Sequence, residues 1–362
     1  MPRQASEASL LSIARTLGLS TATVSNAFNR PERVSAGTLA RIHAEAERKG
    51  YAGPDPAARQ LRRGRADAIG LVLTDELPFA FEDHAAVGFL AGVAQSCQES
   101  GRSLVMLAST ATTNPPLGAV AIDGLIIYSV ADGEPLLTAG RARRVPMVVV
   151  DQPHADPGWD WVGIDDHGVG RVAGEHLARL GHRSVGVLAP RLSRTRRNGP
   201  WPADEEPAYA VLRERITGLR AALAPHGGHA AAIPIEERTI SSERAGATGL
   251  QALMSRHPEL TAVFCLSDEL ALGALARAAE LGIDVPRQLS IVGVDDIERA
   301  EAAGLTTIEQ PLQAKGAVAG RLLMSRIEER LAGRKRAPAQ TRTLPTTLHV
   351  RSTTAPPRRI AS

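Results

Sequence analysis

Hydrophobic positions divide the chain into two parts with different periodicities. Between residues 10 and 49, apolar residues recur at helical spacing and polar residues separate them. From residue 68 onward, short apolar runs alternate with amphipathic stretches of helical period. The first pattern predicts a small all-α unit. The second predicts an α/β body whose parallel sheets are covered by helices.

The stretch from residue 10 to residue 29 predicts two short helices joined by a tight turn. Gly18 breaks the first helix, because glycine takes the positive φ angle that such a turn requires. Ser20 is placed to cap a second helix over Thr21–Phe28, and Val24 returns to the shared core, which is helix-turn-helix spacing. The buried side of the first helix is expected to hold Leu11, Ile13, Ala14 and Leu17.

The outer side of the second helix carries the candidate DNA-binding surface. Its residues are small and polar, as an element that enters the major groove requires. A third helix over residues 34–49 would complete the core, and Tyr51 would close it. The same pattern also suits a helical hairpin inside an ordinary core. The residues expected to contact DNA here are Thr21, Ala22, Ser25, Asn26, Asn29, Ser35 and Thr38.

Residues 54–65, with the sequence PDPAARQLRRGR, connect the two parts as a hinge. Asp55 can cap a helix and Pro56 suits its first position, so about two helical turns are expected. So short a helix is unstable alone in water. We therefore expect two copies to pair over DNA with Leu61 inserted into the minor groove. A linker with solvated arginines is the alternative. Both can apply, since the segment could be a linker in the free protein and a helix in the DNA-bound protein.

The body contains too many strand-like runs for one sheet, so we expect two α/β lobes. The break between the lobes is expected near residues 151–160, with the chain returning near 295–315. The tail, residues 351–362, is expected to be disordered. Strands are expected near 68–74, 103–109, 124–130, 146–151, 161–165, 184–190, 231–235, 261–267, 289–296 and 344–351, and helices near 84–100, 168–180, 208–224, 243–256, 269–281 and 313–332.

Four motifs, in this order, resemble bacterial repressors of the lactose-repressor (LacI/GalR) family. They are STATVSNAFN with VSAGTLARI and the hinge, VGIDDHGVGRVAGEHLARLGHRSVGVL, VFCLSDELALGAL, and VPRQLSIVGVDDIE followed by LTTIEQP. The likeness covers nearly the whole chain. It implies a DNA-binding headpiece and a two-lobed core, like that of periplasmic binding proteins, which binds a small effector between its lobes. The chain departs from the family at Asn26, where an arginine is frequent, and by one extra residue between Tyr51 and the hinge.

Polar residues that follow the predicted strands are the candidate effector contacts, because ligands of parallel sheets bind beyond the carboxyl ends of strands. Carboxylates there suit a polyhydroxylated ligand, since each accepts two hydroxyl donors, and the aromatic pair Phe79 and Phe81 could cover a sugar face. Helix capping is the competing role for Asp268 and Asp295. From strand ends and from the resemblance, the expected effector contacts are Thr74, Phe79, Asp151, Arg215, Asp268, Asp295 and Gln310.

Charge is uneven along the chain. The net charge is only +3, but residues 1–65 hold 11 Lys and Arg against 5 Asp and Glu. A basic end suits a module that neutralises phosphates. Cys97 and Cys265 are expected in the core, His176 on a helix surface and His182 at a helix end. No apolar run is long enough to span a membrane and no signal-peptide core is visible, so we expect a cytoplasmic protein.

Enzymatic functions find little support. The segment HGVGRVAG imitates a dinucleotide-binding loop, but Asp165 and Asp166 open its helix, where a pyrophosphate would need bare amides. Its glycines are expected instead to allow close helix packing. HExxH, GxSxG, P-loop and CxxC motifs do not occur, so no enzyme, metal or cofactor is expected. A stand-alone sugar-binding protein of the periplasmic type is the alternative that the body alone would suggest.

We expect a homodimeric repressor, because two recognition helices one DNA turn apart read a pseudopalindrome. Ligand would change lobe closure and so the pairing of the hinge helices. The chain lacks the terminal leucine heptads that would tie dimers into tetramers. The arginine-rich segment 190–208, which includes Trp201, is expected near the cleft mouth as a solvated loop or a lid. Inward-facing arginines would favour an acidic or phosphorylated ligand.

Overall fold

The computed structural model describes residues 9–53, 64–73, 76–109, 117–154, 156, 158–195, 197–227 and 233–358. The chain forms two compact units, Met1–Ala66 and Asp67–Ser362. The predicted hinge helix with Leu61, and the predicted effector contact Thr74, lie outside the described residues.

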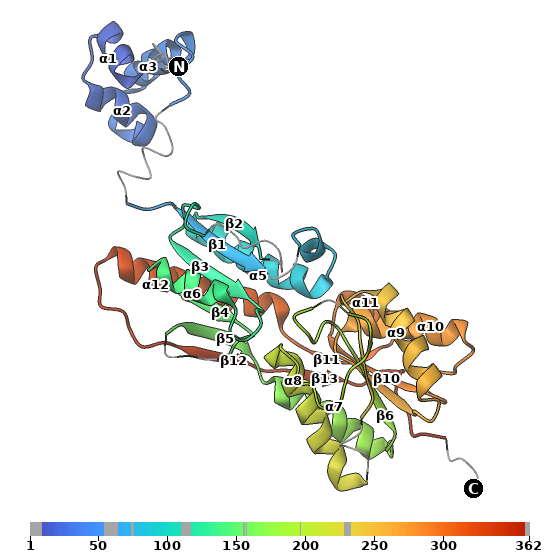
Figure 1. The fold of residues 1–362 in the computed structure, drawn as a ribbon. Helices are drawn as coiled ribbons and strands as arrows, with labels where there is room; N and C mark the ends of the chain where they lie inside the picture. Colours follow the sequence, from blue (N-terminus) through green and yellow to red (C-terminus); the bar gives the residue numbers. More distant parts are fainter. Residues whose placement is uncertain are drawn as a thin grey trace. The chain divides into compact units, whose positions relative to one another are not determined.

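The N-terminal unit is a three-helix bundle (Figure 1) of α1 (Leu10–Leu17), α2 (Thr21–Asn29) and α3 (Ala36–Arg48), with a short 3-10 turn η1 (Pro31–Arg33). Gly18 has φ 64°, as the turn requires, and Ser20 caps α2 by accepting a hydrogen bond from the Thr23 amide. The helix-turn-helix prediction is confirmed in its spacing. The buried core consists of Ile13, Ala14, Val24, Ala27, Ile42 and Ala46.

The prediction that Leu11 is buried is wrong, because its side chain is 51% exposed. At 100° per residue Leu11 lies beyond the edge of the stripe, on the side away from Ile13, whereas Leu10 falls between Ile13 and Ala14 and packs there instead. Tyr51 packs on this core with its ring edge-to-face against Phe28, 5.6 Å between centroids. Tyr51 therefore closes the bundle as predicted.

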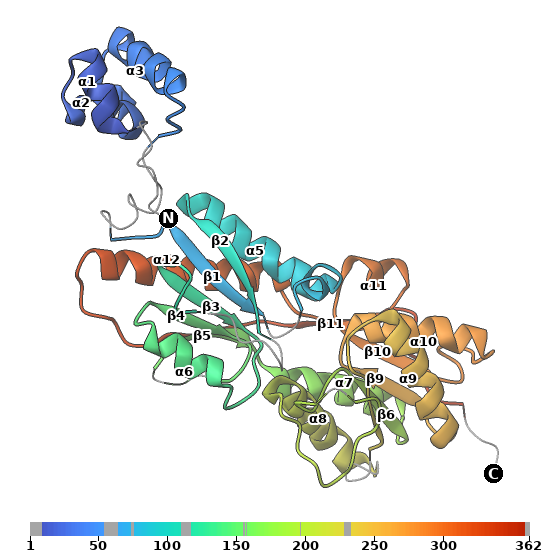
Figure 2. The ribbon, with the colours of Figure 1, turned by 45° about the horizontal axis from the view of Figure 1, so that its top comes forward.

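The C-terminal unit has two α/β lobes, visible in Figures 1 and 2. The lobe 1 sheet is parallel throughout, in the order β12-β5-β4-β3-β1-β2. Its strands are β1 (Ala68–Leu73), β2 (Ser103–Ala108), β3 (Gly124–Tyr128), β4 (Met147–Val150), β5 (Asp160–Ile164) and β12 (Thr341–Leu344). Its helical elements are η2 (Phe79–Phe81), α5 (His84–Ser100), α6 (Pro135–Ala142) and α12 (Leu312–Leu331).

The lobe 2 sheet has the order β13-β11-β10-β9-β6-β8-β7, with antiparallel edge strands β13 and β7. Its strands are β6 (Val185–Ala189), β7 (Gly199–Pro200), β8 (Ile235–Glu237), β9 (Ala262–Cys265), β10 (Ser290–Asp295), β11 (Thr306–Glu309) and β13 (Thr347–His349). Its helical elements are α7 (Asp166–Leu180), α8 (Ala210–Leu223), η3 (Ala224–His226), α9 (Glu243–Arg256), α10 (Asp268–Glu280) and α11 (Glu298–Ala302).

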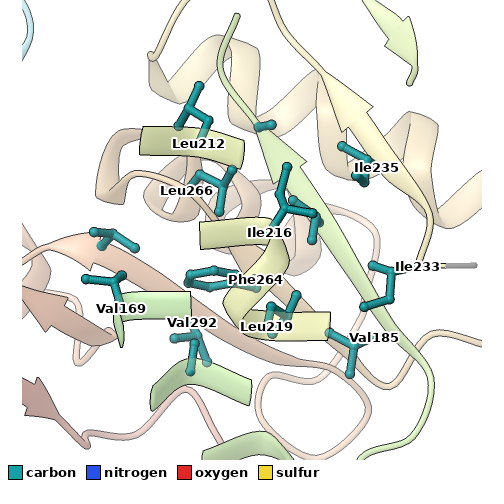
Figure 3. Packing of buried hydrophobic residues seen from close by; sticks show 14 of the residues in the cluster. Val169, Val185, Leu212, Ile216, Leu219, Ile233, Ile235, Phe264, Leu266 and Val292 are labelled. Carbon is teal, nitrogen blue, oxygen red and sulfur yellow. The ribbon is translucent and has the colours of Figure 1, made fainter. Parts of the chain in front are cut away.

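Apolar residues on the two faces of each sheet bury separate sets of helices. In lobe 1, α5 and α12 share one core with Ile69 and Leu71, and α6 lies in the core of the opposite face. In lobe 2, Phe264 and Val292 meet α7 and α8 in the cluster shown in Figure 3. Because helices cover both faces of the sheets, both faces of the parallel strands are apolar. None of the described helices is long and apolar enough to cross a membrane.

The chain crosses between the lobes three times, and the predicted first break is misplaced. Strand β5 pairs with β4, with Val150 opposite Val162, so the first crossing follows Ile164 rather than residues 151–160. The second crossing lies between β11 and α12, within the predicted 295–315 range. The third joins β12 to β13. The two lobes are therefore joined by three chain crossings, an arrangement that permits hinge closure on a ligand.

The glycines that imitate a dinucleotide loop serve helix packing, as predicted. A Cβ atom on Gly170 would lie 1.8 Å from the backbone oxygen of Arg215, and one on Gly174 would lie 2.7 Å from Cβ of Ala222. Both contacts are between α7 and α8. These two helices therefore approach each other at distances that only glycine permits.

The prediction of a disordered tail is wrong for residues 351–358, which lie along lobe 2. Thr353 is 4% exposed, accepts from the Thr306 amide at 2.8 Å and donates to the Ile291 carbonyl at 2.7 Å. The ring of His176 forms a hydrogen bond with Thr354. His176 is therefore buried under the tail, and the prediction that it lies on the helix surface is wrong. The polar composition suggested disorder, but these hydroxyl groups extend the hydrogen bonding of the sheet.

Candidate functional site

The outer side of α2 presents the predicted DNA-binding residues unequally. Thr21 and Ala22 are exposed. Asn29 instead uses its side-chain amide inside the helix, where Nδ2 donates to the Ser25 carbonyl at 2.9 Å and to its hydroxyl at 3.1 Å. Asn26 makes no such side-chain bond to any described residue. The groups best placed to face a DNA groove are therefore Thr21, Ala22 and Asn26.

The start of α3 has a similar internal bond. Ser35 caps the helix, and its hydroxyl donates to Thr38 Oγ1 at 2.9 Å. Both side chains are at the surface of the N-terminal unit, next to helical amides that favour anions. Such a position suits contact with a phosphate rather than with a base.

A cavity of about 200 Å³ lies between the two lobes of the C-terminal unit. Five of the predicted effector contacts line it: Phe79, Asp151, Arg215, Asp295 and Gln310. They come from separate segments, and most follow the carboxyl ends of strands as expected for parallel sheets. Further polar lining residues are Asp83, Tyr128, Ser129, Gln152, Arg191, Tyr209, Thr239, Ser241 and Ser267.

A chain of hydrogen bonds connects three of these residues through a buried lysine. Lys315, 1% exposed, donates to both carboxylate oxygens of Asp151, at 2.8 and 2.9 Å, and to Gln310 Oε1 at 2.8 Å. Gln310 in turn donates to Asp295. The chain fixes the orientation of both carboxylates. Sequence patterns missed Lys315, because nothing in a helical segment marks a lysine that is buried by its partners.

Arg215 projects from α8 into the cavity and is also part of the scaffold. Its Nε donates to Asp166 Oδ1 at 2.8 Å, and Nη1 donates to the Leu266 carbonyl at 3.0 Å. Burial raises the pKa of Asp166 to about 6, and the charge of Arg215 opposes that rise. The guanidinium therefore holds α7, α8 and the end of β9 together while it presents its remaining face to the cavity.

Two carboxyl groups of the cavity have raised pKa values. Burial, reinforced by the charge of Asp295, raises the pKa of Asp83 to about 7. Burial also raises the pKa of Asp295 to about 6, although Arg215 and Gln310 oppose the rise. At neutral pH the cavity therefore offers both carboxylates that accept hydrogen bonds and a carboxyl group able to donate one. Asp83 also caps α5 by accepting a hydrogen bond from the Ala85 amide at 3.0 Å. In the sequence it looks like any other helix cap, so sequence patterns did not mark it as a cavity residue.

Two predicted contacts do not lie at the cavity. Asp268 is fully buried, where its carboxylate accepts from the Thr307 hydroxyl at 2.6 Å and from the Ile297 amide at 3.1 Å. Its role is to join α10 to β11 and to the segment after β10, which corrects the expected effector contact. Phe81 is 64% exposed and does not line the cavity, so only Phe79 of the aromatic pair does.

Among its described arginines, the arginine-rich segment contributes Arg191 to the cavity, and the guanidinium of Arg191 lies 5.1 Å from the centroid of the Tyr209 ring. Arg194 donates to the Asp132 carbonyl of lobe 1. Arg197 pairs with Glu237 at 2.6 Å and lies over Trp201, which is buried in the lobe 2 core. The segment is thus held by its own contacts, and Trp201 is a core residue rather than part of a lid.

Polar contacts connect the lobes around the cavity. His84 Nδ1 of lobe 1 lies 2.5 Å from Glu269 Oε1 of lobe 2. Arg213 donates to Asp132 across the lobes at 3.1 Å. The Val211 amide donates to Gln152 Oε1 at 3.0 Å. The structure therefore has a closed cleft.

One group of side chains has the composition of a metal site. Single oxygen or nitrogen atoms of Asp296, Glu309 and His349 lie within 4.8 Å of one another. However, Arg351 Nη2 lies 2.8 Å from Asp296, which places a guanidinium beside that carboxylate. The group is an ion-pair cluster of lobe 2 in which Asp296 already has a cationic partner and Glu309 lies 2.9 Å from His349 Nε2.

Comparison with known proteins identifies the family. The periplasmic binding protein-like domain matches residues 175–354. An HTH-type transcriptional regulator of Mycobacterium tuberculosis is 41% identical over 330 residues, which cover 89% of this chain and 92% of that protein. The chain belongs to the LacI/GalR family. It is a DNA-binding transcriptional regulator, with a helix-turn-helix headpiece and a two-lobed core.

Solved structures of this family have the same architecture. A LacI-family regulator from Corynebacterium glutamicum is 35% identical, with 96% of this chain and 98% of that chain covered and a TM-score of 0.73. A complex of the regulator CelR with cellobiose is 25% identical, with 95% and 99% covered and a TM-score of 0.66. The family likeness predicted from the sequence motifs is confirmed.

Proposed function

We propose that this LacI/GalR regulator is a homodimeric repressor that releases or binds a pseudopalindromic operator in response to a compact, uncharged polyhydroxylated molecule, such as a sugar. The observation that carries the proposal is the convergence of Asp83, Asp151, Asp295 and Arg215 on one interlobe cavity. Each carboxylate can accept two hydroxyl donors, and the guanidinium offers a fork of donors.

The balance of charge in the cleft favours an uncharged ligand. Three carboxyl groups face two arginines, Arg191 and Arg215, and Lys315 is already engaged by Asp151. Arg194 and Arg197 have protein partners outside the cavity, so the described residues of the arginine-rich segment provide no strong anion site. A phosphorylated ligand would be opposed by the carboxylates. The volume of about 200 Å³ is also below the range of about 300–1,000 Å³ for drug-sized ligands, which suits a small molecule.

Contacts from both lobes supply the coupling to DNA binding. A ligand held by Asp151 and Asp295 at once binds the closed arrangement better than an open one, and only such differential affinity shifts a conformational equilibrium. The CelR complex supports this by analogy, because that relative binds cellobiose. Closure would be transmitted to the hinge, where we propose that Leu61 contacts the minor groove.

The experiment is selection of genomic DNA fragments by the purified protein, followed by titration of the best fragment with neutral sugars and polyols, sugar acids and sugar phosphates. Enrichment of a short pseudopalindrome whose binding changes only with a neutral compound is expected. A response confined to charged compounds would reject the proposed ligand class. Sugar binding without any enriched fragment would favour the alternative of a stand-alone sugar-binding protein.

A pair of variants locates the ligand. Asp295→Asn should raise the effector concentration needed for half-response by about tenfold or more, because a charge-assisted hydrogen bond is lost. Operator affinity without effector should remain unchanged. Asp284→Asn makes the same chemical change at an exposed position outside the cavity and is the matched control. Equal responses of both variants would exclude Asp295 from the site.

DNA contacts are tested separately. Leu61→Ala should weaken operator binding far more than nonspecific binding, because only specific binding is expected to order the hinge over the minor groove. Equal losses of specific and nonspecific binding would contradict the insertion of Leu61 into the minor groove. Asn26→Ala should relax preference at one base pair, since asparagine pairs with an adenine edge, at a cost of about 1–3 kcal/mol. Binding by a dimer predicts two such positions related by the symmetry of the operator.

A further inference from the structure

A second cavity, of about 660 Å³, lies in lobe 1, away from the interlobe cleft. It is enclosed by the C-terminal end of α12, the segment that follows α12, and the turn between α6 and β4. Figures 1 and 2 show this segment leaving α12 and running to β12 at the edge of the sheet. Its floor is apolar, with Val145, Pro146 and Met147. Its walls carry six arginines: Arg141, Arg144, Arg326, Arg330, Arg334 and Arg336.

The only two carboxylates among the described lining residues, Asp160 and Glu329, bond to the same arginine, Arg326. Arg326 is 4% exposed and donates to both oxygens of Asp160, at 3.0 and 2.7 Å. Its Nη1 donates to Glu329 at 3.0 Å. Together with Arg326 the two acids carry one net negative charge, which is too little to neutralise the other five arginines of the cavity.

Two further arginines are held in place by neighbours at the rim. Arg141 pairs with Asp156 at 2.6 Å, and its guanidinium lies 4.3 Å from the centroid of the Trp159 ring. Arg336 donates to the Gly158 carbonyl at 3.1 Å. Preorganised guanidinium groups lose less conformational entropy when they bind a ligand.

The last three arginines, Arg144, Arg330 and Arg334, are exposed and form no ion pair with any described residue. The negative end of the helix dipole explains a cation at Arg330, in the last turn of α12. The helix dipole does not explain why the segment that follows α12 and the region of α6 and the turn before β4 also contribute arginines to this cavity. Unneutralised guanidinium groups that face one cavity repel one another, and an anion relieves that repulsion.

We propose that this cavity binds a small phosphorylated metabolite with at least two negative charges. The arginine forks match the geometry of phosphate oxygens, and the apolar floor suits the carbon skeleton of the ligand. The site differs in chemistry from the interlobe cleft, where carboxylates oppose anions. A phosphorylated ligand here would be a second signal, bound to lobe 1 alone, and the inference does not depend on the proposed effector.

The test is isothermal titration of the full-length protein with inorganic pyrophosphate in 0.15 M KCl. Saturable binding of one pyrophosphate per chain is expected. The double variant Arg330→Ala/Arg334→Ala should weaken it by about tenfold or more, because each lost charge-assisted hydrogen bond costs about that factor. Arg321→Ala removes an exposed arginine from α12 outside the cavity and should leave the affinity unchanged. Arg144→Ala, from the facing wall, should weaken binding independently.

Three outcomes would overturn the proposal. One is the absence of saturation at millimolar pyrophosphate, and another is equal affinity in the cavity variants and the Arg321→Ala control. The third concerns nucleic acid as the source of phosphate. If the double variant lowers the salt dependence of nonspecific DNA binding, the arginines neutralise DNA phosphates rather than a metabolite. An unchanged salt dependence, together with lost pyrophosphate binding, supports the small-molecule site.

Discussion

His84, which starts α5 in lobe 1, has its Nδ1 atom 2.5 Å from Oε1 of Glu269 in the first turn of α10 in lobe 2. The Glu269 side chain is 9% exposed, whereas that of His84 is 46% exposed. The bond joins the lobes without any ligand atom. It therefore contributes to the closed arrangement independently of the groups that line the cavity.

Glu269→Gln should weaken this connection and shift the lobes toward an open arrangement. We expect the affinity for the effector to fall several-fold, because a hydrogen bond to a charged group contributes about 1.5–3 kcal/mol and glutamine retains part of it. Small-angle scattering should report a larger radius of gyration. Glu280→Gln, on the same helix and paired with Arg277 away from the cleft, is the control. Unchanged affinity and size would show that His84 and Glu269 do not support closure.

Lys315→Met should destabilise lobe 1 strongly. The substitution removes the cation that donates to both oxygens of Asp151 and leaves this carboxylate, whose side chain is only 10% exposed, without its partner. Breaking a buried ion pair from one side costs about 3–5 kcal/mol. Urea unfolding should show a lower midpoint, whereas Lys335→Met at an exposed position should not. The double variant Lys315→Met/Asp151→Asn should lose less than the sum of its single variants. Additive losses would mean that the two side chains are not coupled.

Gly170→Ala should destabilise lobe 2 by about 1–3 kcal/mol or more, because the new methyl group would overlap the Arg215 carbonyl and push α7 from α8. Gly118→Ala is the matched control, since a Cβ there meets no atom within 4 Å. Urea unfolding of both variants tests the expectation. Equal midpoints would contradict the close packing of the two helices.

The architecture was predictable because each element has a local signal. Helical periodicity and apolar strand runs located most elements, and the rule that ligands bind beyond strand ends brought Asp151 and Asp295 to the cavity. The lobe break was misplaced because the Pro, Gly and Asp stretch before β5 marks a turn inside lobe 1. The crossing after Ile164 contains no proline and passes almost directly from β5 into α7, so no loop-like stretch marks it.

The parts that escaped prediction depend on tertiary packing. Lys315 and Asp83 look like ordinary helix-surface and cap residues, and only the partners brought by other segments make them part of the site. Asp268 follows a strand as Asp295 does, but its side chain turns to Thr307 and away from the cavity. Residues 351–358 show neither helical nor strand periodicity, and their order comes from backbone and hydroxyl bonds that no periodicity shows.

Asp83 should make stability depend on pH. Its pKa in the folded protein is about 7, against an ordinary value of 3.8, so the folded state keeps a proton that the unfolded chain releases between these values. The stabilisation is fully present below about pH 4 and is lost as the pH rises toward 7. Asp83→Asn does not titrate, and its amide oxygen can still accept from the Ala85 amide. The melting temperature of the variant relative to wild type should therefore rise by a few degrees between pH 5 and pH 8.

Asp284→Asn removes an exposed carboxylate and serves as the control for that comparison. Its melting temperature should follow that of wild type at every pH, because the substitution leaves the carboxyl groups of the cavity in place. If Asp83→Asn also follows wild type in parallel, Asp83 is already ionised in the folded protein at low pH. The cavity would then lack its carboxyl donor, and a ligand would have to satisfy three carboxylates with hydroxyl groups alone.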